Sequence, residues 1–147
     1  SIRINAVRYA GGATRTTKVG APSLCTSGPY SRTRNPLYLG NMIIYLGITL
    51  IAGGQFMWEF LLIVFAFFTF QYSMIISLEE ETLVSLFGDG YEKYRVNVPR
   101  LFPRFYPWFG TDNRSPKTIA KTLQTEKRTL QNIALILLLI ATRTFSG

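Results

Sequence analysis

The longest apolar stretch of the chain covers residues 56–78 and reads FMWEFLLIVFAFFTFQYSMIISL. A helix of about 20 residues, rising roughly 1.5 Å per residue, matches a hydrocarbon core about 30 Å thick. The few polar side chains, such as Glu59 and Ser77, lie toward the two ends, so the helix has no face suited to water. The pattern predicts a membrane-spanning helix that stops at the run Glu79-Glu80-Glu81.

A shorter apolar stretch, LGNMIIYLGITLIA at residues 39–52, comes before the long one. Because this stretch is short for a bilayer crossing, we expect its helix to begin near Pro36, where proline suits the first helical turn. Gly53-Gly54-Gln55 then supplies a tight turn. Together the two stretches predict a transmembrane helical hairpin of about residues 36–53 and 56–79.

Turn residues and prolines divide the rest of the chain into short pieces. Outside the bilayer we expect helices over residues 2–10, 79–87 and 91–96, with Gly88-Asp89-Gly90 as a turn between the last two. The segment VPRLFPRFYPW that follows is expected to be extended. From Pro116 a polar segment leads into IALILLLIA, which predicts an amphipathic helix that enters a final membrane segment.

These elements predict an all-α membrane protein that forms a single membrane domain. Lys and Arg flank the apolar stretches but are absent from the turn at 53–55, which places both flanks in the cytoplasm by the positive-inside rule. The expected parts are a basic cytoplasmic loop region (1–35), the hairpin (36–79), a cytoplasmic covering segment (80–115) and a C-terminal amphipathic or membrane helix (116–147).

The amino-acid composition indicates the class of protein and excludes several kinds of site. The chain is 48% hydrophobic and 14% aromatic, which is typical of a membrane protein. It has no histidine and one cysteine, Cys25, which excludes an internal disulfide, a histidine base and a zinc site of His and Cys, so we expect no metal. The net charge of +8 also suits nucleic acid, but the cations do not form a continuous stripe. Membrane lipids with anionic headgroups explain the charge better, so we expect no nucleic-acid partner.

Two polar or aromatic constellations flank the apolar stretches. Residues 28–41, GPYSRTRNPLYLGN, deliver two arginines and a turn to the cytoplasmic mouth of the hairpin. Residues 87–103 carry aromatic side chains and VPRLFP, and can form a lid over a flat, partly apolar ligand. Both constellations have an alternative interpretation, in which the aromatic residues anchor the membrane interface and the arginines bind headgroups.

The glutamates at the end of the long apolar stretch form a third constellation. Helical spacing aligns Ser73, Ser77 and Glu80 along one line, and Tyr72 and Glu79 along another. Ionised groups at this depth are costly unless they face a cavity or a partner, which makes them candidates for function. The alternative is that the glutamates only mark where the helix leaves the bilayer and pair with Arg or Lys.

Taken together, GPYSRTRNPLYLGN, the apolar hairpin and a segment of the form EExxLxxxFGxxYxxYxxxVPRLFP resemble the integral-membrane S-adenosylmethionine-dependent methyltransferases. These include the isoprenylcysteine carboxyl methyltransferases and the phospholipid N-methyltransferases. The resemblance covers about residues 28–103 and, more loosely, GGATRTTKVGAPSL before them. It implies an enzyme that binds S-adenosylmethionine at the cytoplasmic membrane face, beneath the 80–115 segment. The acceptor would be a lipid, a prenylated molecule or another hydrophobic molecule that arrives from the bilayer.

The resemblance also implies roles for individual residues. Arg34 and Arg100 would hold the carboxylate of the cofactor or an anionic acceptor headgroup, and three tyrosines would pack around the adenine and ribose. Glu79 and Glu80 would bind ribose hydroxyls, balance the sulfonium charge or accept a proton from an amine acceptor, and these alternatives stay open. The expected catalytic residues are Glu80, Arg34 and Arg100, and the expected cofactor-binding residues are Asn35, Tyr38, Gly40, Glu79, Glu80, Tyr91, Tyr94 and Arg100.

The chain departs from the family at Asn35, where many members carry a histidine between the arginine and the proline. Because asparagine cannot act as a base near neutral pH, an alternative is a non-catalytic, methyltransferase-like structural subunit of a larger membrane complex. Family members usually begin with one or two further membrane helices, and Ser1 is not a methionine, so we expect the chain to be incomplete at its N-terminus. The expected location is the bacterial inner membrane, with the site facing the cytoplasm. The sequence leaves the methyl acceptor open.

Overall fold

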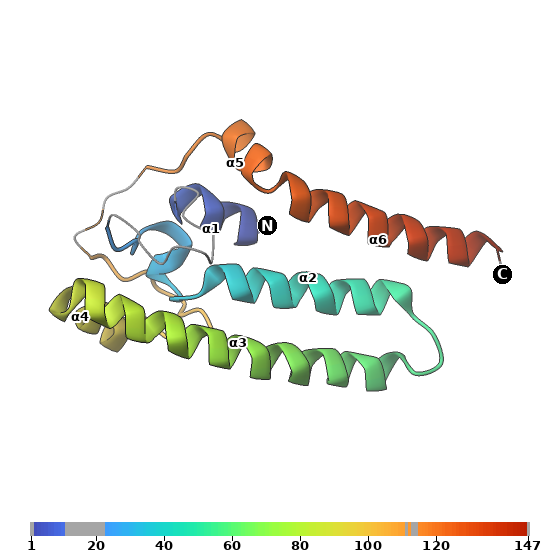
Figure 1. The fold of residues 1–147 in the computed structure, drawn as a ribbon, viewed down its shortest axis with the longest axis horizontal. Helices are drawn as coiled ribbons and strands as arrows, with labels where there is room; N and C mark the ends of the chain where they lie inside the picture. Colours follow the sequence, from blue (N-terminus) through green and yellow to red (C-terminus); the bar gives the residue numbers. More distant parts are fainter. Residues whose placement is uncertain (1, 11–22, 111, 113–114, 147) are drawn as a thin grey trace.

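The computed structural model describes residues 2–10, 23–110, 112 and 115–146, and these are helical or irregular, with no strand among them. Residues 11–22, part of the predicted basic loop region and of the looser resemblance, lie outside the described residues. The elements are α1 (Ile2–Ala10), the 3-10 turn η1 (Gly28–Ser31), α2 (Pro36–Ala52), α3 (Met57–Phe87), α4 (Asp89–Asn97), α5 (Ile119–Thr125) and α6 (Lys127–Ser146) (Figure 1).

The longest helix, α3, has 31 residues and does not stop at the carboxylates. The expected helix end near Glu79, with a separate helix over 79–87, is wrong, because no glycine or proline interrupts α3 and Glu and Leu are good helix formers. The turn predicted at 88–90 is also shorter than expected. Only Gly88, with a positive φ of 48°, lies between α3 and α4.

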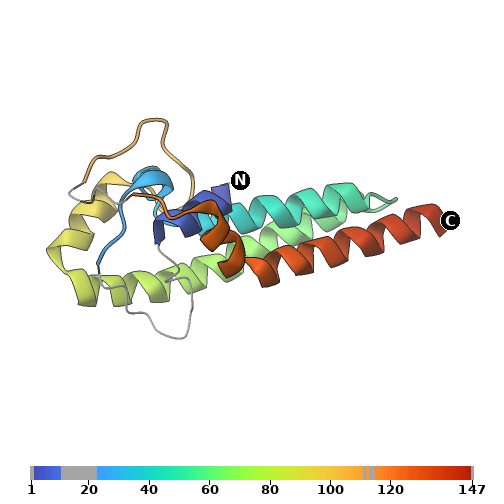
Figure 2. The same ribbon diagram turned by 90° about the horizontal axis from the view of Figure 1, so that it is seen from above.

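α2 and α3 lie side by side, joined by a turn in which Gly53 and Gly54 have positive φ values of 58° and 104° (Figures 1 and 2). Met42 of α2 packs with Tyr72 and Ile76 of α3 in a buried cluster. Because this cluster lies toward the carboxylate end of α3, it fixes the register between the two helices at the end where the predicted functional residues are found.

α3 is the helix of the described residues that is long and apolar enough to cross a membrane, and only 11% of its apolar window is buried inside the protein. Large apolar side chains such as Trp58, Leu62 and Phe70 are about seven-tenths exposed. A soluble protein rarely exposes apolar surface on this scale. α2 is apolar but shorter, with 17 residues.

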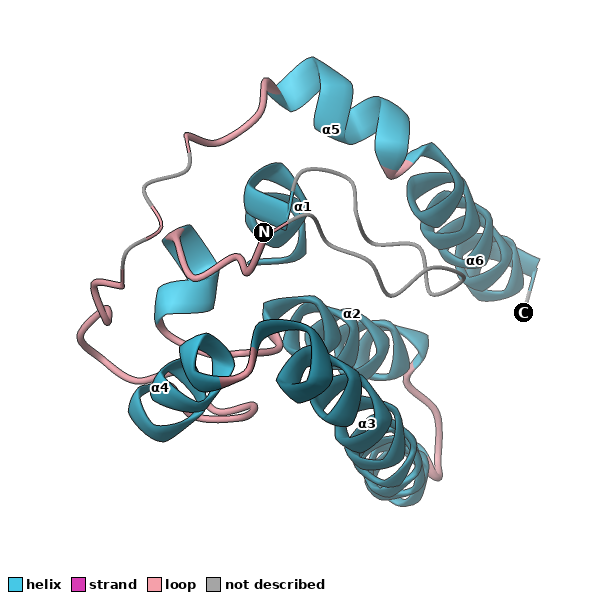
Figure 3. Cartoon of the chain, turned by 60° about the vertical axis from the view of Figure 1, so that its left-hand side comes forward, coloured by secondary structure: helices cyan, strands magenta, loops and turns pink. Residues whose placement is uncertain are grey.

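A second buried cluster forms beyond the end of α3. Its buried members are Tyr91 and Tyr94 of α4 and the residue that caps the end of α4, Val98, each at most 2% exposed. The side chains packed against them include Leu83, Phe87 and Trp108. This cluster folds α4 back beside α3 and holds the irregular segment that follows α4 (Figure 3).

α1 and α6 pack against α2, and α5 packs against α1. Figure 3 shows α2 between α1 and α3, and α6 beside α2. The expected single C-terminal helix is instead two helices, which meet at Glu126. At this junction Arg3 of α1 forms an ion pair with Glu126 at 2.7 Å and donates a hydrogen bond to Asn41 of α2.

Gly40→Ala should destabilise the protein. A Cβ atom at Gly40 would lie 2.8 Å from the Cβ atom of Arg3 and 3.0 Å from its backbone nitrogen, so α1 would have to move. Overpacking of this kind costs about 1–3 kcal/mol. The matched control is Gly47→Ala in the same helix, where the added Cβ atom would have no tertiary neighbour within 4 Å among the described residues. Thermal unfolding in detergent should show a lower midpoint for Gly40→Ala than for Gly47→Ala, and equal midpoints would contradict the prediction.

Candidate functional site

The site begins with two segments, far apart in sequence, that are joined through their backbones. The N–H of Arg34 donates to the carbonyl oxygen of Pro99, and the N–H of Arg104 donates to that of Arg32, each at 2.9 Å. The N–H of Trp108 donates to the carbonyl oxygen of Ser31, also at 2.9 Å. These three hydrogen bonds place residues 31–34 of the first constellation against residues 99–108.

Two side chains reinforce this pairing. Thr33 is 2% exposed, and its hydroxyl donates to the carbonyl oxygen of Leu101 at 2.9 Å. The side-chain amide of Asn35 donates to the carbonyl oxygen of Arg100 at 2.8 Å. The structure therefore gives Asn35 a contact with protein backbone, just before Pro36 begins α2.

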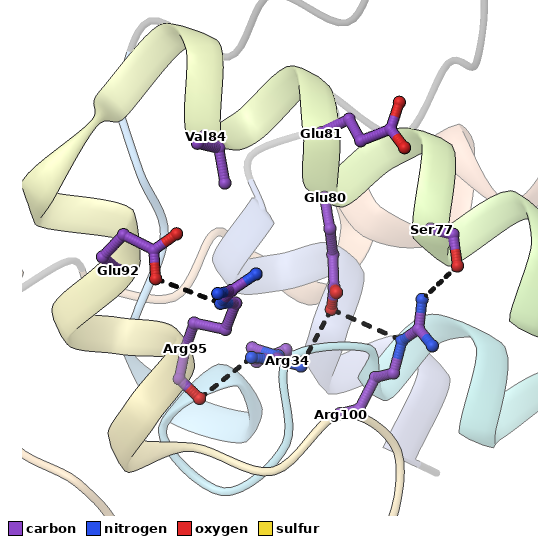
Figure 4. Close-up of a pocket in the computed structure, with 8 residues that line it drawn as sticks. All are labelled: Arg34, Ser77, Glu80, Glu81, Val84, Glu92, Arg95 and Arg100. Carbon is purple, nitrogen blue, oxygen red and sulfur yellow. Dashed lines mark hydrogen bonds and ion pairs between the residues drawn. The ribbon is translucent and has the colours of Figure 1, made fainter.

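Glu80 lies between two arginines at the point where these segments meet α3. One carboxylate oxygen, Oε1, is 3.0 Å from Nη2 of Arg34 and 3.6 Å from Nε of Arg100 (Figure 4). The Glu80 and Arg34 side chains are only 15% and 9% exposed. A buried carboxylate requires such pairing, because removing an ion from water costs several kcal/mol.

The arginines are held by further hydrogen bonds. Nη1 of Arg34 donates to the carbonyl oxygen of Arg95 at 2.9 Å, and Nη2 of Arg100 donates to the hydroxyl of Ser77 at 2.6 Å (Figure 4). Nε of Arg34 is buried and has no hydrogen-bond partner among the described residues. An unpaired buried donor is costly, so this nitrogen is a candidate contact for a bound ligand.

An open hollow of about 760 Å³ borders the Glu80 carboxylate. Three arginines and three glutamates line it, so its formal charges balance. Among the described residues, no group of three or more His, Cys, Asp or Glu could hold a metal ion. The lining residues are Arg34, Ser77, Glu80, Glu81, Val84, Glu92, Arg95 and Arg100 (Figure 4).

Glu79 points elsewhere. Its Oε1 atom accepts a hydrogen bond from the Tyr38 hydroxyl at 2.7 Å, and the Tyr38 ring packs against Tyr72 with ring centroids 4.8 Å apart. Glu79 and Tyr38 do not line the hollow. The structure therefore separates the two glutamates: Glu80 faces the hollow and Glu79 faces α2.

Tyr91 and Tyr94 lie behind the hollow, in the buried cluster. The Tyr94 hydroxyl donates to the carbonyl oxygen of Tyr30 at 2.7 Å. Burial raises the pKa of Tyr91 above the ordinary phenol value, and the nearby negative charge of Glu80 raises it further. Tyr91 therefore stays neutral and packs behind the carboxylate. Its predicted contact with the cofactor stays a prediction, as does that of Tyr94.

Gly40 also lies away from the hollow, beneath Arg3 of α1, where close packing accounts for its lack of a side chain. Two lining residues, Glu92 and Arg95, were not among the predicted site residues, and they form an ion pair at 3.1 Å on α4. Their spacing of three residues on a predicted helix was the available signal. The direction in which α4 folds back, which brings Glu92 and Arg95 to the hollow, could not be predicted from the sequence.

Comparison with known proteins identifies the family. The family model described as phospholipid methyltransferase matches residues 8–90, which is more than half of the 147 residues. The chain belongs to the phospholipid methyltransferase family.

Curated relatives support this assignment. The chain is 42% identical over 82 residues to a protein-S-isoprenylcysteine O-methyltransferase of Schizosaccharomyces pombe, covering 54% of the chain and 33% of the relative. It is 30% identical over 115 residues to methanethiol S-methyltransferase 2 of Bradyrhizobium diazoefficiens, covering 77% of the chain and 42% of that relative. The chain thus spans less than half the length of either relative. No solved structure matches it significantly.

Some residues of the site lie inside the range that the phospholipid methyltransferase model matches, and others lie after it. Residues 8–90 include Arg34 and both glutamates, but not Arg95 or Arg100. The last two are brought to Glu80 by α4 and by the backbone pairing described above. In this family member, the hollow therefore depends on a contact between the matched part and the segment that follows it.

Thr33→Val should weaken that contact. The substitution keeps the shape of the side chain but removes the buried hydroxyl that donates to the Leu101 carbonyl oxygen, which should cost about 1–3 kcal/mol. The matched control is Thr82→Val, because the Thr82 hydroxyl donates only to Leu78 within α3. Limited proteolysis of the 99–108 segment in detergent should be faster for Thr33→Val than for the control. Equal rates would contradict the role assigned to Thr33.

Proposed function

We propose that this protein is a membrane-bound methyltransferase that transfers a methyl group from S-adenosylmethionine to a hydrophobic acceptor. One observation carries the proposal most strongly: Glu80 is held between Arg34 and Arg100 at the edge of an open hollow, close to the end of the apolar part of α3. Membership of the phospholipid methyltransferase family supports the same reaction.

The residues that line the hollow fit the proposed methyl donor. A hollow of about 760 Å³ lies within the range of small-molecule sites. The donor carries a carboxylate, an ammonium and a sulfonium, and the lining offers both arginines and glutamates. We propose that Arg34, through its unpaired Nε, and Arg100 bind the carboxylate, and that Glu80 lies near the positive sulfonium or the ribose.

The remaining predicted site residues would act from behind the hollow. Asn35 holds the Arg100 backbone, Tyr91 packs behind Glu80, and Tyr38 orients Glu79 through a hydrogen bond. In this proposal they position the charged residues and keep water away from them. A rigid, partly dry setting of this kind strengthens electrostatic interactions and holds reactants in line.

The proposed reaction is a nucleophilic displacement at the methyl carbon of the donor. When bound, the donor supplies a methyl group on a positively charged sulfur, which leaves as a neutral thioether while the acceptor nucleophile forms the new bond to the methyl carbon. The protein residues need only orient the two reactants and balance charge, so the lack of a histidine is no obstacle. An amine or thiol acceptor would lose its proton, and we propose that Glu80, which lines the hollow, receives it.

For the methyl acceptor we propose a chemical class and not one molecule. The names of the relatives refer to isoprenylcysteine and to methanethiol. For this chain we propose a lipid, prenylated or other hydrophobic acceptor, which reaches the hollow from the bilayer. A methyltransferase-like structural subunit would have no such acceptor.

We further propose that α2 and α3 cross the membrane as a hairpin and that the hollow faces the cytoplasm, in the inner membrane of a bacterium. The exposed apolar surface of α3 and the absence of Lys and Arg from the turn at 53–55 support this orientation. α6 lies beside α2, and its exposed leucines suit a lipid environment. The chain then forms one membrane domain.

Glu80→Gln should abolish methyl transfer while the protein stays folded. The amide keeps the size of the side chain but removes the charge that the arginines and the sulfonium require, so transfer should fall by about 100-fold or more. The measurement incubates membranes with methyl-labelled S-adenosylmethionine and then counts the lipid and protein fractions separately. Full transfer by Glu80→Gln would remove Glu80 from the site.

The matched control is Asp89→Asn, which removes one exposed negative charge near the start of α4, away from the hollow. Its transfer should equal that of the unaltered protein. Calorimetry in detergent provides a readout without an acceptor, since a structural subunit should show no saturable binding of S-adenosylmethionine. Absence of both binding and transfer in the unaltered protein would overturn the proposed function.

The proposed hairpin predicts which side of the membrane each end of α3 reaches. In a Cys25→Ser background, Gln55→Cys, at an exposed position of the turn, should react with a membrane-impermeant maleimide added to intact bacterial cells, because the turn would lie outside. Asp89→Cys, at the start of α4, should react only after the cells are broken. Reaction of both positions in intact cells, or of neither until the cells are broken, would contradict a crossing by α3.

A further inference from the structure

The segment that follows the hollow presents four aromatic side chains to the outside. Phe102, Phe105, Tyr106 and Phe109 are 75%, 91%, 80% and 87% exposed. We call residues 102–109 the aromatic loop. In Figure 2 this yellow-to-orange segment arches away from the helices. Such exposure is costly in water and indicates a surface that something else covers.

The backbone of the aromatic loop is held in place. Its N–H groups at Arg104 and Trp108 donate to the carbonyl oxygens of Arg32 and Ser31, and Nη1 of Arg32 donates to the carbonyl oxygen of Phe105 at 2.8 Å. Prolines at positions 103 and 107 restrict it further. The four aromatic rings are therefore presented by a braced backbone, which lowers the entropy cost of binding.

The start of the loop lies level with the apolar part of α3. Leu101 packs against the Met42, Tyr72 and Ile76 cluster, and the Arg100 side chain reaches the Ser77 hydroxyl at 2.6 Å. Residues 73–77 belong to the last turns of the apolar stretch before Glu79. The loop therefore emerges where, in the proposed orientation, the hydrocarbon core gives way to headgroups.

The charges beside the aromatic rings suit the same environment. Residues 98–110 contain Arg100 and Arg104 and no acidic residue, and Arg32 lies against Phe105. Aromatic side chains with neighbouring cations are typical of the membrane interface, where rings lie at headgroup level and cations attract anionic lipids.

We infer that the aromatic loop is a membrane-interface anchor, with its rings inserted among the lipids of the cytoplasmic leaflet next to the hollow. Arg100, at the base of the loop, is also part of the lining of the hollow. Insertion of the loop therefore sets the depth of the hollow relative to the lipid headgroups. The inference rests on the membrane orientation proposed above and adds a second contact with the bilayer, separate from the spanning helices.

Site-directed spin labelling tests this inference without requiring activity or a known acceptor. The full chain, in a Cys25→Ser background, carries a single label at Phe102→Cys, Phe105→Cys or Tyr106→Cys, in vesicles of phosphatidylcholine with about one third anionic phosphatidylglycerol. Collision rates with oxygen, which enters the bilayer, are compared with those of a water-soluble nickel chelate. The high exposure of these positions means that the substitutions should not disturb folding.

Two control positions calibrate the measurement. Leu62→Cys on α3 is 70% exposed in the apolar stretch and should favour oxygen, whereas Val96→Cys on α4 is 83% exposed outside it and should favour the nickel chelate. We expect the ratio of oxygen to nickel-chelate collisions in the aromatic loop to be several times that at Val96. Labels in the loop that behave like Val96 would overturn the inference.

Two further outcomes would also overturn the inference. Spectral broadening between loop labels that disappears on dilution with unlabelled protein would show that a second copy covers the rings, and would overturn the inference. A nickel-accessible label at Leu62 would overturn the membrane orientation itself, and the anchor with it. Loss of methyl transfer alone would affect the proposed function and not the anchor, so the two failures are distinguishable.

Discussion

The placement of Glu80 between two guanidinium groups is the interaction on which the arrangement of the site depends. Its carboxylate is largely removed from water, and Arg34 and Arg100 supply the opposing charge at 3.0 and 3.6 Å. The three residues come from the start of α2, from α3 and from the segment after α4. Because a buried charge without its partners costs several kcal/mol, the pairing constrains all three elements at once.

The arginines alone could not provide this constraint. Their long side chains carry about 2 kcal/mol of rotamer entropy each, so an ion pair between flexible segments contributes little. Hydrogen bonds to the backbone supply the missing constraint. Thr33 and Asn35 hold the carbonyl groups of residues 100 and 101, and the Arg34 N–H holds Pro99. The charged groups are therefore carried by segments that these hydrogen bonds hold in position.

Much of this arrangement could be predicted from local sequence. Helical spacing separated the lines of Glu79 and Glu80, and the structure directs Glu79 to Tyr38 and Glu80 to Arg34. Proline and glycine marked where α2 and α4 begin, within one or two residues. These features depend on contacts between near neighbours, or on backbone angles that single residues impose.

Features that depend on tertiary packing could not be predicted. A carboxylate run can end a helix at a membrane boundary or continue it into water, and the packing of Leu83 and Phe87 against α4 adds a tertiary contact to the helix-forming residues that continue α3. The burial of Tyr91 in the same cluster also depends on how α4 folds back, and its predicted contact with the cofactor stays a prediction. Arg3 contacts Gly40, 37 positions along the chain, and Glu126, 123 positions along it, and local spacing cannot indicate contacts at such separations.

The Arg3 contacts also connect the site with the two ends of the chain. Arg3 and Glu126 both lie outside the residues that the phospholipid methyltransferase model matches, and their side chains are 16% and 6% exposed. Removing either would leave a buried charge unpaired, so α1 and the α5–α6 junction depend on each other. Both meet α2 on the side away from α3. α2 is thus held from two sides, and Arg34, two residues before its first turn, is held in position with it.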